Sequence, residues 1–275
     1  MKRSKSKIKR EIMTREKLRQ LLSIKDLTDP VNGVHAINLV VDKIANCLAS
    51  TPGWPKPEIR RGSPITTIAD NFDRLYLPID SIGSWYVTED KILRFHTTCM
   101  IPDILQEVKS KGLEDYVVLC PGICYRRGVV DREHIGEFHQ IDIWRIRKGT
   151  SKLMRPELIK FIETVIYCVL PKVKYRTQEV KYPYILNGLK VELEIKDRWL
   201  GVIGCGEVHP QLLMDANLDP AEYSGLAMGI GLDRLVMIIK GIDNIKLLRI
   251  KDPYISRQMT NLEPYEPVSK YPSIR

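Results

Sequence analysis

The chain has 275 residues, of which 44% are hydrophobic and 28% charged, a composition typical of a folded globular protein and not of a disordered one. No apolar run is long enough to span a bilayer, so we expect no membrane segment. The six cysteines are scattered along the chain, which is typical of reduced thiols in a cytoplasmic protein.

The formal net charge is +9, and most of it lies at the N-terminus. Residues 1–19 contain nine Lys or Arg against two Glu, a balance of +7. Such an arm is typical of contact with a polyanion such as RNA, and equally of a solvated tail. We therefore divide the chain into a basic arm with a short helix (residues 1–28), one folded domain (29–252) and a C-terminal tail (253–275).

Apolar residues at helical spacing predict short helices over 14–22 and 102–109 and longer helices over 34–48 and 157–170. Strands are predicted over 116–120, 138–146, 172–175, 191–195 and 199–204. In the second of these strands, Phe138, Gln140, Asp142 and Trp144 share one face. Clustered strands with helices between them predict an α+β domain with an antiparallel sheet flanked by helices.

A glycine-rich stretch, residues 225–234, predicts a strand that leads into a helix. Gly225, Gly229 and Gly231 would let another group approach the backbone closely, and Arg234 falls in the first helical turn, where its fork of donors suits a phosphate. Lys240-Gly241 is a typical helix end. A glycine-kinked core strand with a solvated arginine fits this stretch alone equally well.

Two familiar kinds of site are not indicated. The pair Cys120 and Cys124 has no second pair at ligand spacing, so a zinc site is not favoured, and the metal content stays unknown. The chain contains no GxxxxGK[ST] loop, which excludes an ordinary P-loop nucleotide site.

Three motifs occur in a fixed order: Tyr-Arg-Arg followed by Phe-His-Gln within residues 121–142, Gly-Cys-Gly followed by Val-His-Pro within 199–210, and Gly-Leu-Ala-Met-Gly-Ile-Gly-Leu-Asp-Arg at 225–234. Together they resemble the catalytic core of class II aminoacyl-tRNA synthetases, nearest to the phenylalanyl-tRNA synthetase α chain, over roughly residues 29–250. The resemblance implies a class II antiparallel sheet flanked by helices, ATP and Mg²⁺ as cofactors, and amino-acid activation followed by transfer to tRNA.

The resemblance also implies a nucleotide site. Arg126 stands where the family's arginine contacts the α-phosphate, and Phe138 where an aromatic ring stacks on adenine. Arg234 matches the arginine that packs on the other face of adenine, and His134 matches the histidine near the outer phosphates. Gly231 belongs to the glycine-rich strand that would lie beside ATP. Cations are expected there, because negative charge develops at the α-phosphate during adenylate formation.

An amino-acid site is implied in the same way. The resemblance assigns to it His96, Thr98, Gln140, Asp142, Tyr182, Tyr184, Cys205 and Ala227. Gln140 and Asp142 would hold the α-ammonium group, and Tyr182 and Tyr184 would grip an aromatic ring. Phenylalanine is the nearest guess for the substrate, although the two hydroxyls would also suit a more polar one.

The sequence departs from the family at three acidic positions, which are occupied by Gly128, Leu186 and Lys190. These departures keep two alternatives open: an enzyme that adenylates an amino acid for an acceptor other than tRNA, and a non-catalytic binding or regulatory protein. We further expect a homodimer through residues 34–48 and the following strand, with tRNA as a partner of the basic arm.

Overall fold

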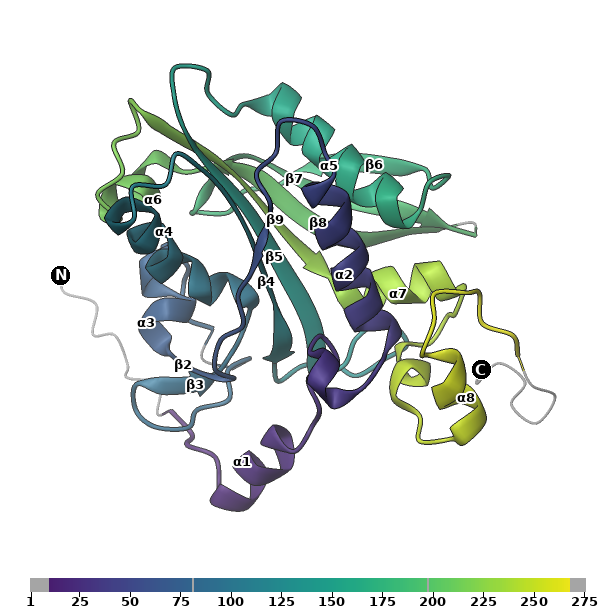
Figure 1. Cartoon of the computed structure of the whole chain (residues 1–275). Coiled ribbons are helices and arrows are strands. Elements are labelled where there is room, and N and C mark those ends of the chain that lie inside the picture. Colours follow the sequence, from purple (N-terminus) through teal and green to yellow (C-terminus); the bar gives the residue numbers. More distant parts are fainter. Residues whose placement is uncertain (1–9, 81, 197, 268–275) are drawn as a thin grey trace.

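The protein's computed structural model describes residues 10–80, 82–196 and 198–267. The centre of the fold is a seven-stranded sheet (Figure 1). The strands lie in the order β1 (Glu58–Ile59), β4 (Asp115–Tyr125), β5 (Glu137–Lys148), β9 (Tyr223–Gly231), β8 (Arg198–Val208), β7 (Ile185–Ile195) and β6 (Tyr175–Glu179). All neighbours pair antiparallel except β1, which runs parallel to β4 at one edge. This confirms the predicted α+β class.

The remaining elements are short or lie on the faces of this sheet. The helices are α1 (Arg15–Leu22), α2 (Ala36–Ala49), α3 (Ile68–Asn71), α4 (Ile101–Ser110), α5 (Arg155–Val169), α6 (Pro210–Asp215), α7 (Leu232–Lys240) and α8 (Pro253–Gln258). Single 3₁₀ turns occur at Pro30–Asn32, Asp73–Leu75, Thr97–Met100 and Ile245–Arg249, and β2 (Ile65–Thr67) pairs with β3 (Lys91–Leu93). Among the described residues, no helix is long and apolar enough to cross a membrane.

Helices α2, α5 and α7 cover one face of the sheet (Figure 1). The apolar stripe of α2 is fully buried against Ile141 and Ile143 of β5, so the burial of this stripe stabilises the protein's own core. The helix begins two residues later than predicted, because His35 caps it: its Nδ1 accepts a hydrogen bond from the N–H of Ile37 at 3.1 Å. Helix α7 ends as predicted at Gly241, which adopts φ +66°.

The opposite face of the sheet is covered by α4 and α6, which pack on Trp144 and Ile146 of β5. The alternation predicted for β5 is therefore confirmed, because Trp144 belongs to one core cluster and Ile141 and Ile143 to the other. Phe138 and Asp142 therefore lie on the same face of β5 as Trp144.

Two strands differ from their predicted extents. The strand predicted over 172–175 is β6 at Tyr175–Glu179, whose side chains are mostly exposed and so give no alternating pattern. Strand β4 continues past Cys120 to Tyr125, although Pro121 and Gly122 favour a break, because every one of these residues is paired with β5. This extension carries the chain directly into Arg126.

The segments outside residues 29–252 also contact the domain. In the arm, Leu21 of α1 is buried against Tyr125 and Leu93, and Ile12 bridges to Tyr86. Residues 1–9 of the arm lie outside the described part of the chain. In the predicted tail, α8 buries Ile255 in the same core as α2.

Candidate active site

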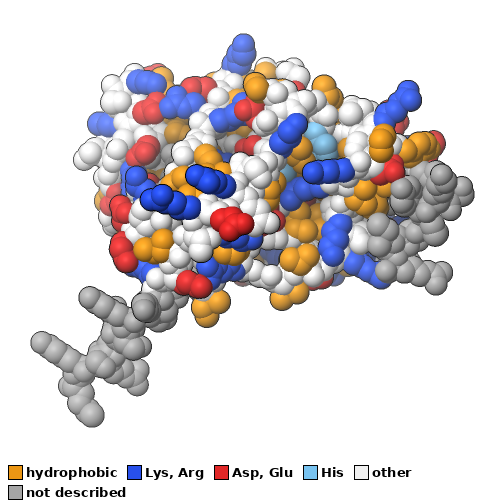
Figure 2. Space-filling model, turned by 90° about the horizontal axis from the view of Figure 1, so that it is seen from below, with side chains coloured by type: hydrophobic (Ala, Val, Ile, Leu, Met, Phe, Trp, Pro, Cys, Tyr) orange, Lys and Arg blue, Asp and Glu red, His pale blue; other side chains and the backbone are white. Residues whose placement is uncertain are grey.

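A cavity of about 720 Å³ lies at the end of the β4–β5 hairpin and over β8 and β9. Seven of the predicted site residues line it: Arg126, His134, Phe138, Gln140, Tyr182, Gly231 and Arg234. On the molecular surface seen from below, Lys and Arg side chains surround a histidine, with few acidic groups among them (Figure 2). We call Arg126, His134, Phe138 and Arg234 the cationic half of the site.

Arg126 projects from the end of β4 between two aromatic rings. Its guanidinium carbon lies 4.4 Å from the centroid of Phe95 and 4.9 Å from that of Phe138, and its Nε donates to the carbonyl of Phe95 at 3.0 Å. Burial lowers the pKa of this guanidinium from its ordinary value. Among the described residues no carboxylate forms an ion pair with Arg126. Its positive charge is therefore held rigidly and is available to an anion in the cavity.

Arg234 in the first turn of α7 is held by three contacts. Its Nη1 donates to the carbonyl of Gly201 at 3.0 Å and its Nε to that of Glu133 at 3.3 Å, while Nη2 lies 2.6 Å from Nε2 of His134. The other ring nitrogen of His134 donates to Asp131 at 2.9 Å, and this bond lowers the pKa of that carboxyl. The hairpin loop and α7 are thereby joined above the cavity.

A buried carboxylate lies behind the cationic half. Asp142 is 4% exposed and accepts hydrogen bonds from Thr97 at 2.6 Å, Thr98 at 3.0 Å and Trp144 at 3.1 Å. Burial raises the pKa of this carboxyl although all three bonds act against the rise. A Cβ built on Gly229, which lines the cavity, would lie 3.8 Å from both carboxylate oxygens. Asp142 is not itself among the residues that line the cavity, and it lies directly behind Gly229, which is.

His96 adds a buried acceptor to this region. Its Nε2 lies 2.8 Å from the carbonyl of Asn71, which fixes the proton on that nitrogen. Burial lowers the pKa of His96 to about 3, so the ring is neutral. Its Nδ1 has no hydrogen-bond partner among the described residues, and such an acceptor is suited to a donor on a bound ligand. We call His96, Thr98, Asp142 and Tyr184 the acidic half of the site.

Aromatic rings enclose the acidic half. The ring of Tyr184 stacks on Trp144 with centroids 6.3 Å apart and lies 5.9 Å from that of Tyr182. Burial raises the pKa of the Tyr184 hydroxyl. Ala227 faces Trp144 across the β5–β9 ladder and shares its apolar cluster. This arrangement suits a flat apolar side chain.

The remaining predicted residues occupy different places. Gln140 lines the cavity, where its Oε1 accepts from the thiol of Cys124 at 3.5 Å. Cys205 lies on the other face of the sheet, in the core beneath α5, and its thiol points to the carbonyl of Leu189 at 3.7 Å. The thiol of Cys205 thus has no access to the cavity, because β-strand side chains alternate between faces and its neighbour Gly204 is the one that lines it.

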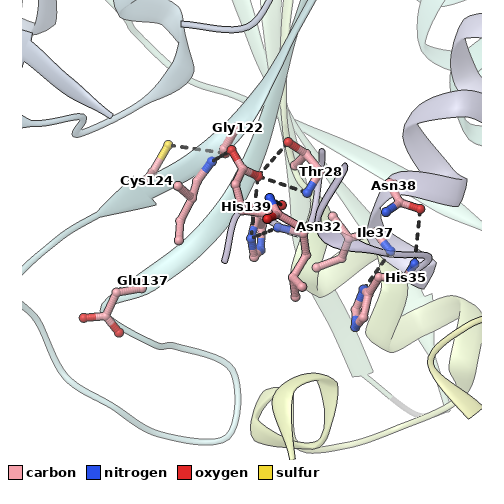
Figure 3. Close-up of polar contacts among 12 residues, drawn as sticks. Thr28, Asn32, His35, Ile37, Asn38, Gly122, Cys124, Glu137 and His139 are labelled. Carbon is pink, nitrogen blue, oxygen red and sulfur yellow. Dashed lines mark hydrogen bonds and ion pairs between the residues drawn. The ribbon is translucent and has the colours of Figure 1, made fainter. Parts of the chain in front are cut away.

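Sequence reasoning missed a buried polar network beneath the cationic half. His139 is fully buried, and its ring Nε2 accepts a hydrogen bond from the backbone N–H of Leu27 at 3.0 Å. Its ring Nδ1 and its backbone N–H both contact the carboxylate of Asp233. Arg249 donates to Asp233 at 2.9 Å. Figure 3 shows the side chain of His139, a residue of β5, beside the segment that contains Thr28. The one signal for it was the position of Asp233 directly before Arg234.

A second missed residue is Arg94, which is 1% exposed. Its Nε donates to the carbonyl of Ile123 at 2.8 Å, and its Nη2 lies 3.7 Å from Asp26. A Cβ on Gly122 would lie 2.1 Å from this guanidinium, so only glycine leaves room for it. Arg94 thereby fixes the end of β4 from which Arg126 projects.

The donor set of the cavity does not fit a Mg²⁺ site. Its three lining carboxylates are each engaged: Asp131 by His134, Glu133 by Arg198, and Asp233 by His139 and Arg249. The described residues contain no group of three or more side chains suited to hold a metal ion. Mg²⁺ normally takes one or two protein carboxylates besides phosphate oxygens. The three positions at which the sequence lacks a family acid agree with this lack of metal ligands. Gly128 and Lys190 line the cavity without supplying a carboxylate, and Leu186 is 40% exposed.

Comparison with known proteins identifies the family to which the chain belongs. Residues 23–259 match the model of the class II core domain (F) of tRNA synthetases. The phenylalanine–tRNA ligase alpha subunit of Acaryochloris marina is 30% identical over 238 residues, which cover 83% of this chain and 68% of the relative. That of Coxiella burnetii is 31% identical over 234 residues, 82% and 68% of the two chains. A probable mitochondrial phenylalanine–tRNA ligase of Drosophila melanogaster is 27% identical over 76% of this chain and 57% of its own.

Proposed function

The chain belongs to the family of class II tRNA synthetase core domains, and we propose that it activates an amino acid with ATP and transfers the aminoacyl group to tRNA. Phenylalanine or a related aromatic amino acid is the proposed substrate. The observation that carries the proposal is the charge of Arg126, which has no carboxylate partner among the described residues and lies between Phe95 and Phe138, in a cavity that Arg234 also lines.

The chemistry follows from the two halves of the site. A carboxylate oxygen of the amino acid attacks the α-phosphorus of ATP, and pyrophosphate leaves with the electrons of the broken bond. Arg126 offsets the negative charge that develops at the α-phosphate, and it needs little reorganisation because its stacking fixes it beforehand. Phe138 and Arg234 supply an aromatic face and a flat cation between which adenine fits.

The acidic half orients the other reactant. Asp142 and the free Nδ1 of His96 can both accept hydrogen bonds from an α-ammonium group, which would aim the carboxylate of the amino acid at the α-phosphate. The rings of Trp144, Tyr182 and Tyr184 suit an aromatic side chain. The Tyr hydroxyls also favour a test of tyrosine and other polar analogues beside phenylalanine.

The partners and assembly are proposed on separate grounds. Residues 1–9 carry five Lys or Arg and no acid, which supports contact with the phosphates of tRNA. The apolar stripe of α2 is buried in the protein's own core and cannot contact a second copy. A homodimer of this enzyme, which we place in the cytoplasm, would therefore use the outer, polar face of α2 and the sheet edge at β1. The loss of acids at Gly128, Leu186 and Lys190 is the observation that favours the second candidate, an acceptor other than tRNA.

The test is pyrophosphate exchange with a panel of amino acids, followed by charging of total tRNA. We expect ATP–pyrophosphate exchange with phenylalanine or another aromatic amino acid, and aminoacylated tRNA as the product. Exchange without charging would support the other acceptor. The absence of exchange with every amino acid would contradict the proposed activity.

A further inference from the structure

Lys190 of β7 adds a fourth Lys or Arg to the lining of the cavity, after Arg126, Arg127 and Arg234. Its stem crosses Gly201: a Cβ built there would lie 2.5 Å from Cε and 3.3 Å from Nζ of Lys190. The carbonyl of the same Gly201 accepts the hydrogen bond from Nη1 of Arg234 at 3.0 Å. The ammonium and the guanidinium therefore meet at one backbone unit, on the wall of the cavity.

Lys190 forms an ion pair with Glu192 that it can exchange for a bond to another anion. Its Nζ donates to Oε1 of Glu192 at 2.7 Å, while Arg176 bonds the other oxygen, Oε2, also at 2.7 Å. Because Arg176 alone balances this carboxylate, Lys190 can turn to another anion without leaving Glu192 unpaired. The three side chains together carry one positive charge, and that of Lys190 is 42% exposed.

A nucleoside triphosphate needs counter-charge at its outer phosphates, and the described residues that line the cavity offer no free carboxylate to hold a divalent ion there. We infer that Lys190 binds the outer phosphates of ATP beside Arg234 and takes over charge neutralisation that a protein-bound Mg²⁺ would otherwise provide. This inference rests on the proposed function, since it assumes that the ligand is ATP. A charge-assisted hydrogen bond of this kind changes affinity about tenfold or more.

Calorimetric titration with ATP and with AMP, each in EDTA and in MgCl₂, tests the inference. The wild-type protein is expected to bind ATP in EDTA within about threefold of its affinity in MgCl₂. K190Q should bind ATP in EDTA about tenfold more weakly, and AMP nearly as well as the wild type, because AMP lacks the outer phosphates. K190E should regain a dependence on Mg²⁺, since it adds a second carboxylate next to Glu192.

The matched control is K174Q. It removes an exposed lysine whose Nζ lies 3.2 Å from Oε2 of Glu194, and neither residue lines the cavity. It should bind both nucleotides as the wild type does, and circular dichroism should show all three variants folded. Unchanged ATP affinity of K190Q in EDTA, or loss of wild-type binding in EDTA alone, would overturn the inference and leave the proposed function standing. Failure of the wild type to bind ATP under either condition would overturn both.

Discussion

The two halves of the site differ in how much of their bonding is complete before a ligand arrives. In the cationic half, Arg126 is stacked and its charge has no carboxylate partner among the described residues. In the acidic half, Asp142 already accepts three hydrogen bonds within the protein. A nucleotide therefore meets a preformed anion site, whereas an amino acid must share or displace existing bonds, and binding of the two substrates should respond differently to mutation.

The largest effect is expected from R126A. Loss of a preorganised cation at a developing charge costs about 10²–10³-fold in rate, so pyrophosphate exchange should fall by at least this factor. R126K keeps the charge without the planar fork and should recover only part of the rate. R147A, at the other end of β5, serves as the control and should leave exchange unchanged. A folded R126A protein with wild-type exchange would remove Arg126 from the site.

The variant D142N probes the acidic half. We expect the KM for the amino acid to rise roughly 10–100-fold, because a hydrogen bond to an ionised group is lost, while the affinity for ATP changes little. Burial raises the pKa of Asp142, so the ionised form opposes folding above that pKa, and the free energy of unfolding of D142N at pH 7 should equal or exceed that of the wild type. A KM that stays at the wild-type value would place the ammonium elsewhere.

The network under the cationic half predicts a change in stability with a definite pH dependence. Burial alone would raise the pKa of Asp233, but His139 and Arg249 outweigh it and hold the value at about 2. A depressed carboxyl pKa stabilises the fold above its ordinary value of 3.8 and loses that contribution as the pH falls toward 2. D233N should therefore cost about 3 kcal/mol at pH 7, since it leaves Arg249 unpaired.

Denaturant unfolding at several pH values measures this effect. The difference between D233N and the wild type should shrink between pH 4 and pH 2. A difference that is constant over this range would mean that Asp233 acts through shape and not through charge. The D142N protein is the internal comparison, because the Asp142 carboxyl that it lacks is also buried in the wild type, but burial shifts the pKa of that carboxyl in the opposite direction.

The smallest expected effect concerns the arm. Deletion of residues 1–9 removes five positive charges and none of the described contacts of Glu11 or Ile12. Affinity for tRNA should fall and its salt dependence should flatten, by about 0.7 in the log–log slope for each single-stranded phosphate contact that is lost. Pyrophosphate exchange should be unaffected. Equal tRNA affinity and slope with and without these residues would identify the segment as a solubilising tail.

The sequence was informative where function is carried by local motifs. Arg126, Phe138 and Arg234 belong to short runs with distinctive spacing, and the alternation of β5 was enough to place Phe138 and Asp142 on one face. The bonds that position these groups could not be predicted, because they join distant parts of the chain: Leu27 to His139, Asp233 to Arg249, and Arg94 to Ile123. No local pattern marks such contacts.

Cys205 illustrates the opposite failure. Its motif suggested a pocket residue, yet the register of β8 directs Gly204 to the cavity and Cys205 to the core. A motif identifies a strand that borders the site, and only the alternation of side chains decides which of its residues can touch a ligand. Strand β6 was misplaced for a related reason, since exposed edge residues carry no hydrophobic alternation.

The most direct test of the account is a crystal structure with phenylalanine sulfamoyl adenosine, a stable mimic of the aminoacyl adenylate. We predict that its adenine lies between Phe138 and Arg234, its sulfamoyl group lies beside Arg126, and its ammonium group lies within hydrogen-bonding distance of Asp142. Binding with the adenosine outside this cavity, or with the ammonium far from Asp142, would contradict the division of the site into a cationic and an acidic half.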